Sequence, residues 1–165
     1  MGVMNNIVAQ NPDYLFMIES ACKAPSGHNT QPWLFKIRES EIDIYPDLTK
    51  ELPVVDPSHR ELFVSLGCAT ENLCIAAQEK GYQTEVKVIK DSFIRVLLTK
   101  DKKKQFDSSL FSQIAVRQTN RSVYDGKEIP KDSINLLKAT SVASLRLKKS
   151  FETWKKQLLA VKCGK

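Results

Sequence analysis

Two arginines on either side of a threonine are the first candidates for chemistry in this sequence. Arg117, Thr119 and Arg121 occupy alternate positions in a polar stretch. Each guanidinium supplies a rigid fork of donors and the threonine adds a neutral hydroxyl, so the three side chains can converge on one phosphate. A solvent-exposed basic turn accounts for the same residues equally well.

A second polar segment, residues 24–33, lies between a predicted helix end and a predicted strand start. It contains Pro25, Ser26, Asn29 and Gln31. Binding groups concentrate on loops that rigid elements hold in place, which favours a ligand site here. The alternative is a turn whose Ser, Asn and Thr side chains satisfy the local backbone.

Composition narrows the class of protein. Of 165 residues, 42% are hydrophobic and 27% charged, the ordinary mix of a globular chain. No apolar run approaches the ~18 residues of a membrane span, and no signal peptide is evident. The four cysteines form no C-x-x-C pair, which gives a zinc site little support. We therefore expect reduced thiols, a cytoplasmic location and no membrane partner.

The net charge of +6 indicates an anionic partner only weakly. The lysine-rich clusters lack the interleaved aromatic side chains that favour nucleic-acid binding, so we interpret them mainly as solvated helix faces and loops. No nucleic-acid partner is expected. A phosphate-bearing cofactor needs only two or three of these charges.

Hydrophobic periodicity predicts a mixed α+β fold, with a small, mainly antiparallel sheet flanked by helices around one long buried helix. The long helix is expected to open with a capping box of Ser58 and Glu61 and to end at Gly81. Its two adjoining apolar or small stripes predict burial on more than one side. The other predicted elements are helices over residues 11–24, 105–116, about 134–137 and 150–161, and strands over 33–38, 42–45, 82–90 and 93–99.

These features together resemble the nitroreductase family. Residues 24–33 match its pattern of a helix that ends at Ala-Pro-Ser and passes through Asn and Gln-Pro-Trp into a strand. The long helix from Ser58 looks like the central helix of that family, which lies at the heart of a homodimer. Residues 117–121 are similar to its phosphate-binding Arg-x-Ser-x-Arg motif.

The resemblance implies an FMN-dependent oxidoreductase that uses NAD(P)H to reduce a nitroaromatic, a quinone or a related small-molecule acceptor. It implies a homodimer and no catalytic side chain of the protein. The alternative is a non-catalytic flavin-binding or flavin-storage protein with an occluded cofactor. The residues implied to bind FMN are Arg117, Thr119 and Arg121 at the phosphate, and Pro25, Ser26, Asn29 and Gln31 along the ribityl chain and ring edge.

The order of the motifs departs from that of ordinary nitroreductases, in which the arginine motif precedes the Pro-Ser loop. Here the arginines follow everything else, an order that resembles double-length nitroreductase-like proteins. We therefore expect residues 1–116 to form a nitroreductase-like half. Residues 117–165 would carry the arginine segment and C-terminal helices, as the start of a truncated second half. An inert fragment is a third possibility if part of the pocket is missing.

Overall fold

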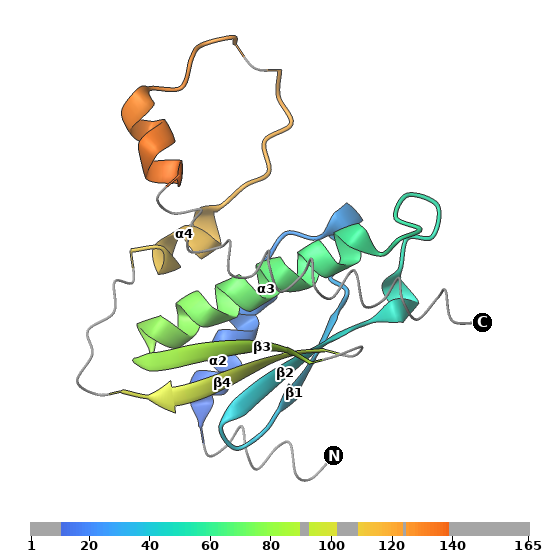
Figure 1. The fold of residues 1–165 in the computed structure, drawn as a ribbon, viewed down its shortest axis with the longest axis vertical. Coiled ribbons are helices and arrows are strands. Elements are labelled where there is room, and N and C mark those ends of the chain that lie inside the picture. The colour runs from blue at the N-terminus through green and yellow to red at the C-terminus, as the bar shows by residue number, and fades with distance from the viewer. Residues whose placement is uncertain (1–10, 90–92, 102–108, 124, 139–165) are drawn as a thin grey trace. The chain divides into compact units, whose positions relative to one another are not determined.

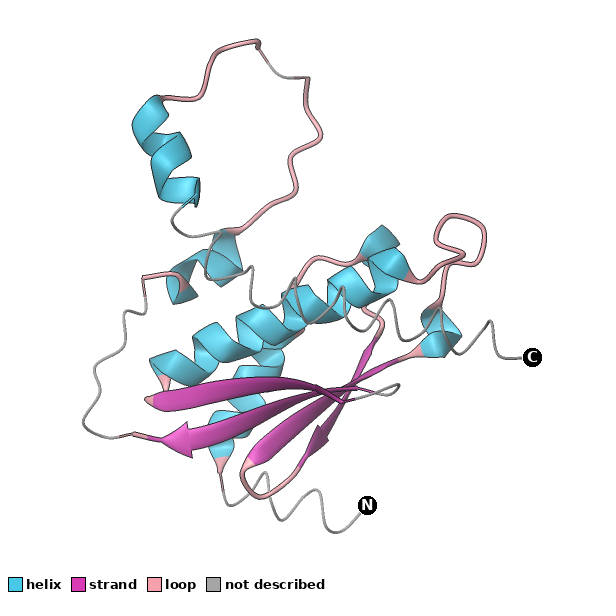
Figure 2. Cartoon of the chain, in the orientation of Figure 1, coloured by secondary structure: helices cyan, strands magenta, loops and turns pink. Residues whose placement is uncertain are grey.

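The α+β fold predicted from the sequence is confirmed by a computed structural model, which describes residues 11–89, 93–101, 109–123 and 125–138. Figure 1 shows the order of the elements along the chain, and Figure 2 shows the helices and strands by type. The chain divides into two compact units, Met1–Arg117 and Gln118–Lys165. The sheet and the long helix belong to the first unit.

Four antiparallel strands form one sheet in the order β1-β2-β4-β3. The strands pair as two hairpins, and β2 joins them by pairing with β4. The register aligns Ile37 with Ile42, Ile44 with Ile94, and Val86 with Val96, so that alternate apolar residues share one face. The strands run over Trp33–Ile37 (β1), Glu41–Pro46 (β2), Tyr82–Ile89 (β3) and Phe93–Lys100 (β4).

The helices form where the local signals predict them. Asn11 caps α2 (Pro12–Ala21) by accepting the Asp13 N–H at 3.2 Å. After α3 (Arg60–Glu79), Gly81 adopts φ +75 and its N–H donates to the Gln78 carbonyl at 2.8 Å. The remaining described helices are η1 (Gly27–Asn29), η2 (Leu48–Lys50), α4 (Phe111–Val116) and residues 131–138. The predicted helix over residues 150–161, and residues 102–108, lie outside the described residues.

The predicted capping box is wrong. His59, not Ser58, occupies the N-cap position of α3, and it makes no side-chain capping bond. Asp56 supplies the cap, since its Oδ2 accepts the Leu62 N–H at 3.0 Å. The chain turns back at this point through a bond from the His59 N–H to the Asp56 carbonyl, which brings that carboxylate under the helix end.

The core lies between α3 and one face of the sheet, with α2 packed beside α3. The first predicted stripe of α3 is wholly buried, and it consists of Leu62, Leu66, Ala69, Leu73, Ala76 and Ala77. In the second stripe Thr70 and Cys74 are buried, whereas Phe63 and Gly67 are partly exposed. Burial raises the pKa of the Cys74 thiol to about 12, so this cysteine is protonated and acts as a small core residue.

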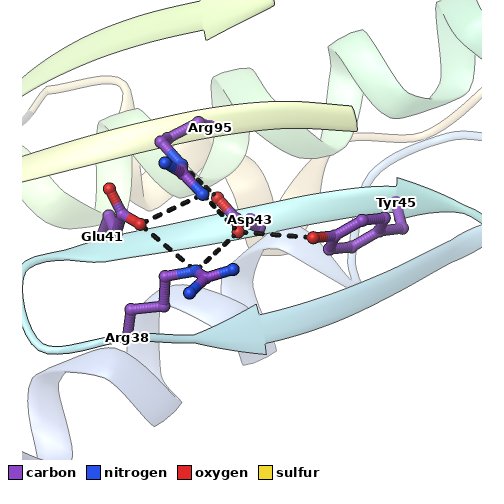
Figure 3. Close-up of polar contacts among 5 residues, drawn as sticks. All are labelled: Arg38, Glu41, Asp43, Tyr45 and Arg95. Atoms are coloured by element: carbon purple, nitrogen blue, oxygen red, sulfur yellow. Dashed lines mark hydrogen bonds and ion pairs between the residues drawn. The ribbon is translucent and has the colours of Figure 1, made fainter. Parts of the chain in front are cut away.

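The opposite face of the sheet carries a polar cluster around one carboxylate (Figure 3). Asp43 on β2 is fully buried, although no described helix packs on this face. Arg95 contacts both carboxylate oxygens, at 2.7 and 3.0 Å, and Arg38 contacts one at 2.9 Å. Glu41 lies 3.2 Å from each guanidinium, and the Tyr45 hydroxyl is 3.5 Å from Asp43. These side chains cover Asp43 and bind β1, β2 and β4 together.

The protonation of Asp43 follows from these contacts. Burial acts to raise the pKa of the carboxyl, but the hydrogen bonds and charges of Arg95 and Arg38 outweigh burial. The pKa therefore lies below its ordinary value. The resulting stabilisation is fully present above the pKa of an unfolded aspartate, about 4, and is lost as the pH falls from there through the lower folded pKa.

We predict that Asp43→Asn lowers the free energy of unfolding by about 1–3 kcal/mol at neutral pH, because the charged partner of two guanidinium groups is removed. The measurement is urea denaturation at about pH 7 and about pH 3. The difference between wild type and variant should shrink at the lower pH. Glu85→Gln is the matched control, since Glu85 is an exposed carboxylate of β3 that pairs with Lys87. An equal loss for both variants would contradict the role of Asp43.

We also predict that Asp56→Ala lowers the free energy of unfolding by about 1–2 kcal/mol, because α3 loses the acceptor of one N-terminal N–H. Ser58→Ala should change it by less than about 0.5 kcal/mol, as at an ordinary surface position. Urea denaturation of the two variants side by side gives the comparison. A larger loss for Ser58→Ala would restore the capping box that the sequence predicted.

Candidate functional site

The segment between α2 and β1 adopts an unusual backbone conformation. Three of its residues that are not glycine have left-handed backbones: His28 (φ 51), Asn29 (φ 56) and Gln31 (φ 50). Asparagine tolerates this region better than most residues, but each such position still costs about 1–3 kcal/mol. A loop of this kind persists only where its surroundings hold it.

Hydroxyl groups within the loop provide part of that support. The Ser26 Oγ accepts the Gln31 N–H at 2.9 Å, and the Thr30 Oγ1 donates to the Gly27 carbonyl at 3.0 Å. These two hydroxyls therefore support the alternative interpretation of the segment, a turn whose side chains satisfy its own backbone. Pro25 and Ser26 are partly buried, whereas the Asn29 and Gln31 side chains are exposed. The two amides are therefore accessible to solvent, as is the neighbouring His28 side chain.

Two residues outside the loop also contact it, and the sequence analysis missed both. Ser65 of α3 accepts the Gly27 N–H at 3.2 Å, and Lys50 of η2 donates to the Gln31 carbonyl at 3.2 Å. Ser65 is only 3% exposed, and a buried hydroxyl needs a hydrogen-bond partner. A serine within an apolar helical stripe was therefore a usable signal. The sequence around Lys50 offers none.

A small pocket lies where the loop meets the N-terminal end of α3. It has room for about one water molecule, far less than a flavin ring requires. Asp56, Glu61, Lys50 and Ser65 all line it, as does Gly27 of the loop. The pocket is therefore part of the support of the loop. Its lining residues are Gly27, Thr30, Pro32, Lys50, Leu52, Asp56, Glu61, Leu62 and Ser65.

The predicted phosphate-binding residues fall in both units of the chain. Arg117 ends α4, which packs on α3. Burial raises the pKa of the Cys68 thiol on α3, Glu71 adds to this rise, and the nearby charge of Arg117 opposes it. Thr119 and Arg121 are exposed residues of the second unit. Their convergence with Arg117 on one phosphate stays a prediction.

The helices in the described ranges include none that is both long and apolar enough to span a membrane.

Comparison with known proteins identifies relatives in Mycobacterium tuberculosis (strain H37Rv). Over 124 residues, or 72% of this chain, it is 31% identical to the protein named "Putative NAD(P)H nitroreductase Rv3131". Over 69 residues, or 42% of this chain, it is 29% identical to "Putative NAD(P)H nitroreductase acg". The matches cover 36% and 21% of those proteins' own length, so the chain spans about a third of the first relative. No protein-family model matches the chain. The two matches confirm the resemblance that the motifs predicted.

Proposed function

Because this chain is a relative of nitroreductase-type proteins, we propose that it is an FMN-binding oxidoreductase, or part of one. It would use NAD(P)H to reduce a small-molecule acceptor such as a nitroaromatic or a quinone. The observation that supports this most is the loop of residues 24–33, whose costly backbone conformation presents two exposed amides beside the central helix α3. Strained backbone of this kind concentrates at ligand sites.

The side chains present have the chemistry that FMN requires. The Asn29 and Gln31 amides each offer donors and an acceptor, which suits the ring edge and the ribityl hydroxyls. Pro25 and Ser26 would complete that side of the site. Bound flavin would supply the redox chemistry, while the protein supplies binding, orientation and charge. We assign no catalytic side chain.

Arg117, Thr119 and Arg121 would bind the phosphate. Arg117 and Arg121 carry permanent charges and bidentate forks, and Thr119 would add a neutral donor. Arg117 and Arg121 are both exposed and thus accessible to an anion. The loop would thus recognise the ring and ribityl chain, and the arginine segment would recognise the phosphate.

We further propose that the chain self-associates through α3, as the family resemblance implies. The outward side of α3 carries Val64, Cys68, Glu71 and Ile75 at helical spacing. Val64 is 51% exposed, and the other three are partly buried within the single chain. The Glu71 carboxyl is partly buried within the single chain, and this burial raises its pKa. A second copy across a two-fold axis would cover this side of α3.

The proposed phosphate site yields a prediction about ligand preference. The protein should bind FMN more tightly than riboflavin. Arg117→Ala and Arg121→Ala should each weaken FMN binding about 10- to 150-fold, since each removes a charge-assisted hydrogen bond, and should leave riboflavin binding unchanged. The measurement is quenching of flavin fluorescence during titration with protein.

Lys127→Ala serves as the control for those titrations, because Lys127 is an exposed cation of the same unit as Arg121 and pairs with Asp125. It should change neither affinity. Equal losses of FMN and riboflavin binding in the arginine variants would mean that the arginines act through folding. A wild-type chain that quenches neither flavin would remove the cofactor proposal.

A second prediction separates the enzyme from the flavin-storage alternative. In anaerobic solution, excess NADH or NADPH should bleach the visible absorbance of bound flavin, and a nitroaromatic or quinone should restore it. Photoreduction of the same sample shows that the flavin is reducible. A flavin that is bleached by light but stays oxidised with both nicotinamides would favour storage.

A further inference from the structure

We propose that Ser65 and Lys50 are positioning residues of the flavin site, which hold the loop of residues 26–31 in its ligand-binding conformation from two sides. This inference rests on the proposed function, because it assigns the loop to flavin. It concerns two residues that no motif identified. Neither residue is proposed to touch the flavin.

The need for external support follows from the backbone of the loop. His28, Asn29 and Gln31 lie in the left-handed region within four consecutive residues. In the described part of the chain, the Ser26 and Thr30 hydroxyls bond to groups of the loop itself, so these two bonds do not fix it to the rest of the protein. A conformation this costly needs contacts with rigid elements if it is to be the main one in solution.

Ser65 provides such a contact on the inner side. Its hydroxyl donates to the Glu61 carbonyl at 2.7 Å within α3, which fixes the orientation of the oxygen. That oxygen accepts the Gly27 N–H at 3.2 Å, across 38 positions of sequence. The loop is thus joined to the N-terminal part of a helix that is buried against the sheet.

Lys50 provides the contact on the outer side. Its ammonium donates to the Gln31 carbonyl at 3.2 Å, at the third left-handed residue. The turn that carries it is itself well held, because Asp47 Oδ1 accepts both the N–H and the hydroxyl of Thr49 at 3.1 and 2.6 Å. The Asp47 N–H also donates to the Pro32 carbonyl at 3.1 Å. The end of the loop is thereby fixed to η2.

These contacts affect flavin affinity because they change the conformation of the loop in the flavin-free protein. If only a fraction of molecules holds the loop in the binding conformation, the apparent dissociation constant rises in inverse proportion to that fraction. Removing either contact lowers the fraction without touching the ligand. The loss should affect FMN and riboflavin equally, because the loop is assigned to the ring and ribityl chain that both share.

The experiment combines flavin titration with hydrogen exchange of the loop amides in the full chain without flavin. Ser65→Ala and Lys50→Met should each raise the dissociation constants of FMN and riboflavin about 3- to 10-fold, alike for both ligands. The Gly27 and Gln31 amides should exchange faster, with the midpoint of urea unfolding little changed. Ser65→Thr and Lys50→Arg, which keep the donor or acceptor, should restore most of the affinity.

Lys87→Met is the matched control, because Lys87 is a similarly exposed lysine on β3 that pairs with Glu85. If Ser65→Ala fails to fold, Lys50→Met alone decides, since an exposed side chain does not endanger the core. Unchanged exchange of the loop amides, or unchanged flavin affinity despite faster exchange, overturns the positioning role while the proposed function stands. A wild-type chain that binds neither flavin overturns the proposed function, and with it the assignment of these two residues.

Discussion

The burial of α3 against the sheet is the contact on which the other elements depend. Its inner stripe, from Leu62 to Ala77, contains leucines that fill the space above the strands and alanines that let the helix lie close. Loss of any of the buried leucines would leave a cavity, and such substitutions typically cost about 2–5 kcal/mol. The helix also gathers the surrounding elements, since α2, α4 and η1 all contact it. A loop that bonds to α3 is therefore connected to the core through it.

The two faces of the sheet are stabilised by different physics. One face is covered by helices and contributes apolar burial, the dominant favourable term in folding. The other face carries the buried carboxylate of Asp43. Two arginines and a tyrosine contact this carboxylate and cover it in place of a helix. Such a cluster adds less net stability than apolar packing, but removing one partner is costly because a buried charge then loses its partner. The lowered pKa of Asp43 makes the stabilisation from the second face sensitive to acid pH.

Most of the fold was predictable from local signals. Asn11 and Gly81 mark helix ends by rules that involve neighbouring residues alone, and the alternation along β3 and β4 needs only the period of a strand. The cap of α3 was mispredicted for a physical reason. Ser58 and Glu61 satisfy the spacing of a capping box, but a left-handed residue at His59 carries the chain past Ser58 and brings the Asp56 carboxylate to the helix instead. The predicted box would have bonded Ser58 to the Glu61 N–H, whereas the observed cap is the bond from the Leu62 N–H to Asp56, and the backbone of the turn selects the second.

Only part of the candidate site was predictable from the sequence. The predictable residues lie close together in the sequence, whereas the others belong to distant segments. The residues within 24–33 and 117–121 could be identified from the sequence, because each group is a short continuous run that resembles a family motif. The supports of the loop belong to other segments: the Ser65 contact spans 38 positions and the Lys50 contact 19. Which backbone group a buried serine meets depends on how α3 and the loop approach each other, and that approach depends on the whole core. Sequence alone can say that Ser65 must find a partner. It cannot say that the partner is Gly27, because that pairing exists only once the sheet has set the position of the helix.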